Sequence, residues 1–259
     1  MSRALVQLNP WVLGLLIVLG APLVTVLVQA AVRRFAPSIV EGQHNDVAGF
    51  LIAVVGVVYA VTLAFIVIVT WEEFRDARDV VDREAGALRS LYRDSQSLPE
   101  PARARMSDLA VRYARELTDN EWSAMDKGES SRAAFDLVGD MFATLGSTNP
   151  TTSTQETFLS DALVRLNDVA EDRAERITVA EEGTVSVLWV AIVIGGVLTV
   201  GFALLFGVSN ERLHYLMVGV FAAVLALQIF VILVLNHPFS GDVRVDPEPF
   251  EHIVRDFSR

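Results

Sequence analysis

The chain has 259 residues, of which 52% are hydrophobic and 20% are charged, and its formal net charge is −11. This mixture is too apolar for an ordinary soluble domain unless the two classes of residue are segregated along the chain. The acidic balance argues against nucleic acid as a partner. The absence of cysteine excludes disulfides, thiolate catalysis and cysteine metal sites.

The hydrophobic residues are segregated into four stretches. These stretches lack charged side chains and run from Trp11 to Val32, from Val47 to Trp71, from Gly183 to Asn210, and from Leu213 up to Asp242. A helix crosses the bilayer core with roughly 20 apolar residues, so every stretch is long enough to span it. In lipid the backbone can hydrogen-bond only with itself, and the runs lack the polar alternation of a membrane β-barrel. The sequence therefore predicts an all-α integral membrane protein with four transmembrane helices.

The first stretch also has features of a secretory signal peptide, because Arg3 precedes it and small residues stand near its end. Its apolar core is longer than the roughly 7–15 residues of a cleaved signal. Arg33 and Arg34 follow it as the flank of a membrane anchor would. We therefore expect this stretch to remain in the membrane as the first span.

Arginine placement predicts the orientation, since Lys and Arg are retained on the cytoplasmic side. Four spans place both termini and the segment between the second and third spans on one side. That side carries Arg3, Arg75, Arg78, Arg83, Arg89, Arg173, Arg176 and Arg244 near the membrane. The opposite side carries Arg33, Arg34 and Arg212. Arg33 and Arg34 favour the reverse orientation for the first helix, but the totals predict cytoplasmic termini.

The segment between the second and third spans is long, acidic and helical in its pattern. It continues the second span, since no proline interrupts it before Pro99, and its apolar residues recur every three or four positions. The sequence predicts four regions along the chain. They are transmembrane helices 1 and 2 in 11–71, a cytoplasmic helical domain in 72–182, transmembrane helices 3 and 4 in 183–235, and a cytoplasmic C-terminal tail in 236–259.

Residues in this insert and after the fourth span resemble one known family. They are Glu84, Leu88, Tyr92, Leu98, Pro99, Tyr113, Glu121 and Trp122, and then Pro238, Phe239, Ser240 and Gly241. Over about residues 45 to 250 the chain resembles the bestrophin-like membrane proteins of bacteria, and more distantly the bestrophin channels. The resemblance implies a homo-oligomeric ion channel of the bacterial inner membrane, a pentamer by family analogy. Its partners would be copies of itself, membrane lipid and inorganic ions.

The segment after the fourth span carries a second implication of the resemblance. Bestrophins have an Asn-Pro-Phe-Gly stretch there, followed by acidic residues that bind calcium in animal members. Asn236, Pro238, Phe239 and Gly241 look like that stretch, which would make Asp242 and Asp246 metal ligands. EF-hand spacing is absent, so a solvated acidic tail is the alternative. Calcium is the one cofactor that the sequence suggests.

A polar face of the second span is the candidate pore lining, because polar side chains in a membrane helix prefer a bundle interior or a wet cavity to lipid. Spacings of three or four residues place on this face Tyr59, Thr62, Ile66, Thr70 and Glu73. The alternative is that Thr62 and Thr70 bond to carbonyls of their own helix. We predict that the face lines a pore on a symmetry axis, where Ile66 forms an apolar constriction that gates by dewetting.

The charge at the end of the second span predicts the sign of the conducted ion. Glu72, Glu73 and Asp76 stand at the expected cytoplasmic mouth, and residues 72–182 hold 24 Asp and Glu against 14 Lys and Arg. A ring of carboxylates within a Debye length of the axis, about 8 Å at physiological salt, concentrates cations. We therefore favour monovalent cations, whereas the resemblance to bestrophins favours anions such as chloride.

No pattern in the sequence indicates an enzyme. The four histidines are scattered without metal-ligand spacing, and there is no phosphate-binding glycine loop, metalloprotease helix or nucleophile elbow. The leading hypothesis is thus a homo-oligomeric channel. A non-conducting membrane scaffold or sensor, in which the helical insert binds a partner, is the alternative from another functional class.

Overall fold

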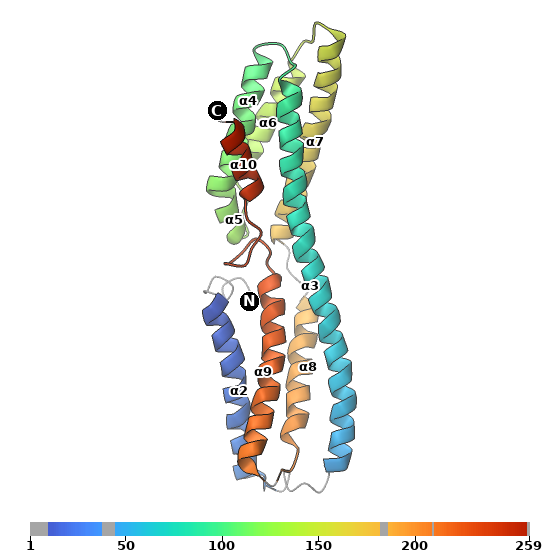
Figure 1. Ribbon diagram of the computed structural model, residues 1–259, viewed down its shortest axis with the longest axis vertical. Coiled ribbons are helices and arrows are strands. Elements are labelled where there is room, and N and C mark those ends of the chain that lie inside the picture. Colours follow the sequence, from blue (N-terminus) through green and yellow to red (C-terminus); the bar gives the residue numbers. More distant parts are fainter. Residues whose placement is uncertain (1–9, 38–44, 182–185, 209, 258–259) are drawn as a thin grey trace. The chain divides into compact units, whose positions relative to one another are not determined.

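The computed structural model describes residues 10–37, 45–181, 186–208 and 210–257, which form helices joined by loops without any β-strand (Figure 1). The chain divides into two compact units. We call Met1–Glu73, Thr184–His237 and Gly241–Val243 the membrane unit, and Phe74–Gly183, Pro238–Ser240 and Arg244–Arg259 the helical unit. The all-helical architecture agrees with the fold class that the sequence predicts.

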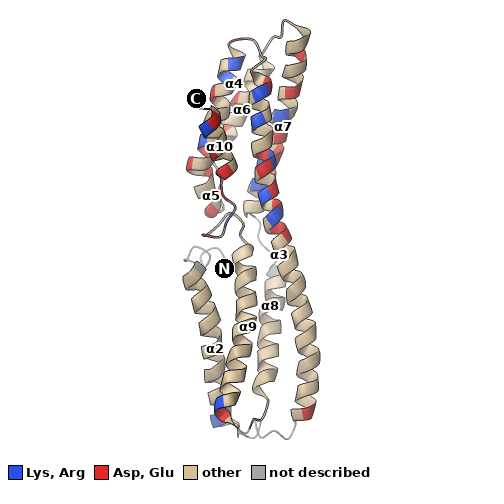
Figure 2. Cartoon of the chain, viewed as in Figure 1, with Lys and Arg blue, Asp and Glu red and all other residues tan. Residues whose placement is uncertain are grey.

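The membrane unit contains the four apolar helices. They are α2 (Pro10–Phe35), the first part of α3 (Asn45–Ser95), α8 (Ser186–Leu204) and α9 (Glu211–Leu235). Among the described residues, α2, α3 and α9 are long and apolar enough to cross a membrane, and Leu188–Leu204 of α8 is a shorter apolar helix. In Figure 2 the charged residues of these helices lie only near their ends.

Close contacts between small and large residues fix the packing inside the membrane unit. Helix α2 lies antiparallel to α9, with Gly14 beneath the Phe230 ring near one end and Gly219 beside Val26 farther along. Tyr59 of α3 lies against α8, where its hydroxyl donates to the Ile192 carbonyl at 2.7 Å. A small residue at the contact lets two membrane helices approach closely.

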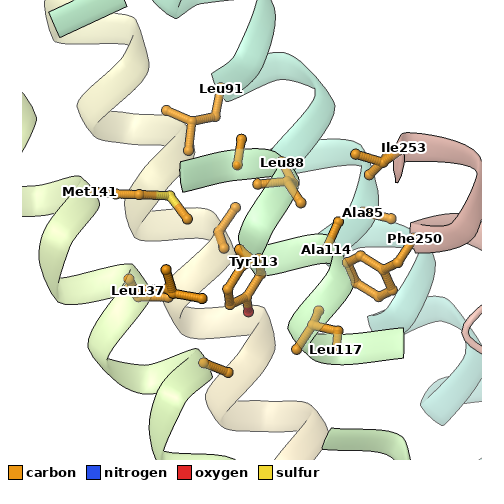
Figure 3. Packing of buried hydrophobic residues seen from close by; sticks show 14 of the residues in the cluster. Ala85, Leu88, Leu91, Tyr113, Ala114, Leu117, Leu137, Met141, Phe250 and Ile253 are labelled. Atoms are coloured by element: carbon orange, nitrogen blue, oxygen red, sulfur yellow. The ribbon is translucent and has the colours of Figure 1, made fainter. Parts of the chain in front are cut away.

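The helical unit surrounds a continuous apolar core. Its elements are the second part of α3, α4 (Ala102–Glu116), the π-helical turn η2 (Leu117–Glu121), α5 (Trp122–Asp126), α6 (Arg132–Gly146), α7 (Ser153–Glu181) and α10 (Glu248–Phe257). Figure 3 shows Leu88 of α3, Tyr113 of α4, Met141 of α6 and Phe250 of α10 meeting in this core. These side chains recur at helical spacing, so each helix buries one face.

Local signals set the ends of the shorter helices. Gly128 has φ 77° just beyond α5, the left-handed conformation in which glycine commonly ends a helix. The hydroxyl of Ser131 then accepts a hydrogen bond from the Ala134 N–H at 3.2 Å and caps α6. These two residues reverse the chain and direct α6 back along α4.

Candidate functional site

The predicted pore-lining face of α3 lies largely inside the subunit's own helix bundle. Tyr59, Ile66 and Thr70 are buried, and Ile66 is 5% exposed in a cluster with Leu63 and Ile192. Thr62 and Thr70 donate to the carbonyls four residues earlier, at 2.9 and 2.8 Å. Both threonine hydroxyls are thus satisfied within α3 itself, as the alternative interpretation expects. Pore lining by this face stays a prediction.

The predicted cytoplasmic mouth is exposed. Glu72, Glu73 and Asp76 follow the apolar part of α3, and all three carboxylates face away from the packed interior. They are therefore accessible to solvent and to ions. The charge-selective ring itself requires several subunits and stays a prediction.

A second face of α3 is apolar and remains uncovered. Val54, Val57, Val61 and Ile68 are 49, 64, 50 and 53% exposed, and they recur at spacings of three, four and seven residues. Glu72 continues this face, four residues after Ile68. The face with Tyr59 packs within the subunit, whereas this face is available to lipid or to another subunit.

The two candidate calcium ligands are both exposed. Asp242 belongs to the membrane unit, and Asp246 belongs to the helical unit, where its carboxylate lies 3.8 Å from the Arg244 guanidinium. Within the described ranges, no group of three or more His, Cys, Asp or Glu is arranged to hold a metal ion. Calcium at these aspartates stays a prediction.

A buried network of ionic groups, which the sequence analysis did not identify, occupies the core of the helical unit. Arg176 of α7 is fully buried, and its Nε donates to Glu84 of α3 at 2.6 Å. Its Nη2 donates to Glu121 of η2 at 2.8 Å. Arg173, one turn earlier, donates to the other oxygen of Glu121 at 2.7 Å. The network thus contains two carboxylates and two guanidinium groups, whose charges cancel.

Two further hydrogen bonds reach carboxylate oxygens that the arginines already contact. The Tyr113 hydroxyl donates to Glu84 at 2.6 Å, and the Ser131 N–H donates to Glu121 at 3.2 Å. Burial, the largest single influence, lowers the pKa of Arg176, but the nearby carboxylates of Glu84 and Glu121 raise it by more. Burial, followed by the Glu84 charge, raises the pKa of Tyr113 well above its ordinary value. The arginine is thus held charged and the tyrosine neutral.

Several of the residues that carry the family resemblance lie in or beside this network. The Arg176 guanidinium lies 4.9 Å over the Trp122 ring, and the Trp122 Nε1 donates to the Val245 carbonyl at 2.9 Å. Phe239 meets the Trp122 ring edge-on at 6.1 Å. The π-helical turn, a feature frequent at functional sites, ends at Glu121. Five of the scattered matches therefore lie in one buried cluster, namely Glu84, Tyr113, Glu121, Trp122 and Phe239.

One sequence signal could have revealed the network. Arg173 and Arg176 lie on the face of α7 that also buries Leu166 and Val169, so they interrupt an apolar stripe. By their position in the sequence, both arginines are expected to be charges near the membrane surface and to count toward the orientation. Their burial in ion pairs removes them from that count, which weakens the predicted orientation without reversing its sign.

The comparisons with known proteins agree on family and fold. A model of the bestrophin-like domain matches residues 19–250. No curated protein sequence matches the chain. A crystal structure of a membrane protein with a proline-to-alanine substitution is similar with TM-score 0.69 and 14% identity, covering 93% of this chain and 97% of that one. A bacterial bestrophin homologue from Klebsiella pneumoniae with a tyrosine-to-alanine substitution is similar with TM-score 0.63 and 14% identity, covering 94% and 96%. The resemblance predicted from the sequence is confirmed, and the chain belongs to the bestrophin-like family.

Proposed function

We propose that the protein is an ion channel, formed by several copies of the chain around a symmetry axis, with α3 lining the pore. The observation that carries this proposal is the apolar face of α3 that one subunit leaves uncovered, with Val57, Val61 and Ile68 in line with Glu72. Copies related by an axis would bring these faces together. Membership of the bestrophin-like family supports the same architecture.

A polar residue in α9 supports self-association. Gln228 lies in the middle of the apolar part of this helix and is exposed. Within the described residues no hydrogen bond satisfies its side-chain amide, and an amide in hydrocarbon is costly without a partner. A neighbouring subunit would supply that partner.

The pore face is either the uncovered face or the face that the sequence predicts. Val61 and Ile68 represent the first, and Tyr59, Ile66 and Thr70 represent the second, with Thr62 and Glu73 at its edges. We favour the uncovered face, since Ile66 already packs against its own subunit. Apolar side chains around a narrow axis would gate by dewetting.

A pair of matched substitutions separates the two faces. Replacing Ile68 by Asn should raise ion leak from liposomes, because a polar side chain at the constriction favours water. Replacing Ile66 by Asn should instead lower the amount of folded protein and leave the flux per folded oligomer unchanged. The opposite pattern would assign the pore to the face with Tyr59, Ile66 and Thr70.

We propose the charge sign of the conducted ion from the carboxylates at the predicted cytoplasmic mouth of the pore. Glu72, Glu73 and Asp76 favour monovalent cations by concentrating them at the axis. A reversal potential in asymmetric salt should show cation preference for the wild type and a weaker preference for Glu72→Gln. Chloride preference in the wild type would reject the carboxylate ring and favour the anion channel.

The orientation in the bacterial inner membrane is proposed from the arginine totals. The cysteine-free chain permits single cysteines to be labelled on whole cells with an impermeant thiol reagent. A cysteine at Phe35, exposed at the end of α2, should react, and one at Ser147, exposed after α6, should not. Labelling at Ser147 alone would reverse the proposed orientation.

A further inference from the structure

A buried polar cluster lies in the membrane unit where α2 ends and α9 begins. Gln29 of α2 and His214 of α9 are 0 and 2% exposed. The Nδ1 atom of His214 lies 2.9 Å from Nη2 of Arg33 and 3.3 Å from Nε2 of Gln29. The same Arg33 Nη2 donates to the Val208 carbonyl at 3.2 Å, and Nη1 lies 3.3 Å from Glu211. The cluster therefore joins α2, α9 and the residues that precede α9.

The contact with Arg33 defines the protonation state of His214. A guanidinium group has donors and no acceptor, so Nδ1 of His214 must accept and can carry no proton. The charged groups around the ring are Arg33 from α2 and the mostly exposed Glu211 from α9, and the backbone of Ala203 faces it from α8. A proton on Nδ1 would abolish the contact and place two positive groups 2.9 Å apart.

Gln29 offers an alternative partner for a protonated ring. Its Oε1 is buried and has no hydrogen-bond partner among the residues that the structure describes. Rotating the terminal amide by half a turn exchanges Oε1 with Nε2, which already lies beside Nδ1. In this orientation Gln29 would accept a hydrogen bond from a protonated Nδ1, and its unpaired acceptor would be satisfied.

We propose that Gln29, Arg33 and His214 form an acid-sensitive latch between α2 and α9. With neutral His214, Arg33 donates to the ring and holds the end of α2 against the start of α9. When a proton binds Nδ1, Gln29 turns its amide to accept it, and Arg33 leaves the ring while keeping Glu211 as its partner. No bond other than hydrogen bonds changes, and the proton comes from solvent.

The latch would regulate the channel, and this part of the inference rests on the proposed function. In the proposed orientation the end of α2 faces the outside of the cell. Histidine is the side chain whose ordinary titration falls between about pH 5 and 8, so external acid is the natural signal. Release of Arg33 would free one end of the α2 and α9 contact.

The first test measures the ring directly and requires no conduction. Histidine labelled with ¹⁵N in the full-length protein in nanodiscs gives ring signals for only four residues, and His214→Gln assigns the signal of interest. At neutral pH the Nδ1 atom should be unprotonated and should lose its contact in Arg33→Leu. Gln29→Met, which removes the alternative acceptor, should move the titration of His214 to lower pH. A ring protonated at Nδ1 at neutral pH, or a titration unaffected by Gln29→Met, would refute the latch.

The second test measures flux from liposomes as the external pH falls from neutral to about pH 5. The flux of the wild type should change by at least about fivefold over this pH range, which is the lower end of ordinary allosteric coupling. The flux of His214→Gln should not change. Arg33→Leu should show the acid-state flux already at neutral pH, and the exposed neighbour Arg34→Leu should behave as the wild type. His237→Gln and His252→Gln should keep the response.

These outcomes separate the latch from the channel. Flux that responds equally to acid in His214→Gln would reject regulation by the latch while leaving the channel intact. The expected ring signals without any flux would support the latch and reject the channel.

Discussion

The apolar side chains of helix α3 are more completely buried in its second part than in its first part. In the helical unit, Ala85 and Leu88 of α3 are completely buried in the apolar core, whereas in the membrane unit Val57 and Val61 are exposed over half or more of their surface. Apolar surface exposed to water costs roughly 25 cal/mol per Å², so the helical unit must cover it. In a membrane this unit needs no such cover, because lipid tails are as apolar as its side chains.

The two units also differ in how their buried polar groups are paired. The helical unit buries Arg176, Glu84 and Glu121 in one closed network. In the membrane unit, Gln29 is buried near the end of α2 and keeps an unpaired oxygen. Every carboxylate oxygen of Glu84 and Glu121 is paired, which favours one arrangement of that core, whereas the unpaired Gln29 oxygen allows its cluster a second arrangement. The comparison suggests a rigid helical unit and an adjustable membrane unit.

The largest expected effect comes from opening the network of the helical unit. Arg176→Met should destabilise this unit by about 3–5 kcal/mol, since Glu84 and Glu121 would remain buried without their partner. Hydrogen exchange of α4 and α7 peptides in the full-length protein would measure the loss. Protection equal to that of the wild type would mean that the core relaxes and admits water.

Tyr113→Phe tests the hydrogen bond to the network. It should cost about 1.5–3 kcal/mol, because the hydroxyl donates to a charged acceptor. The raised pKa of Tyr113 adds a pH dependence. Its contribution is fully present below the unfolded pKa of about 10 and is lost as pH rises toward the higher folded pKa. Urea unfolding at neutral and alkaline pH should therefore show a steeper alkaline decline in the wild type than in Tyr113→Phe.

Gly195→Ala tests the packing of the membrane unit. A β-carbon at Gly195 would lie 2.5 Å from Cε2 of the Tyr59 ring, so we expect a loss of about 1–3 kcal/mol from overpacking. Gly201→Ala is the matched control on the same helix, because nothing lies within 4 Å of a β-carbon there. Thermal unfolding in detergent compares the two variants, and equal midpoints would show that the Tyr59 ring moves aside freely.

The smallest effect is expected at the surface of the helical unit. Arg83 of α3 lies 3.0 Å from Asp172 and 2.6 Å from Glu175 of α7, and half of its side chain is exposed. Arg83→Gln should cost only about 0.2–1 kcal/mol, and high salt should reduce the difference. The same hydrogen-exchange measurement as for Arg176→Met applies. A loss as large as that of Arg176→Met would remove the distinction between buried and exposed pairs.

The helical periodicity of the sequence predicted much of the fold. Ala85, Leu88 and Tyr113 lie on the buried faces that their spacing indicates. The amphipathic helix α10 was missed, although Phe250 and Ile253 have helical spacing and are buried. Its short apolar pattern stands among acidic residues, which made a solvated tail the simpler interpretation.

The sequence by itself determined which segments are apolar helices and which family the chain resembles, because hydrophobicity and spacing are local properties. Only the tertiary structure decided which partner each polar side chain meets. Arg176 lies 92 residues from Glu84, and His214 lies 181 residues from Arg33. Helical spacing identifies a face of one helix but not the helix that covers it. The same limit applies to Ile66 and Ile68, whose surroundings depend on where α8 and α9 pack.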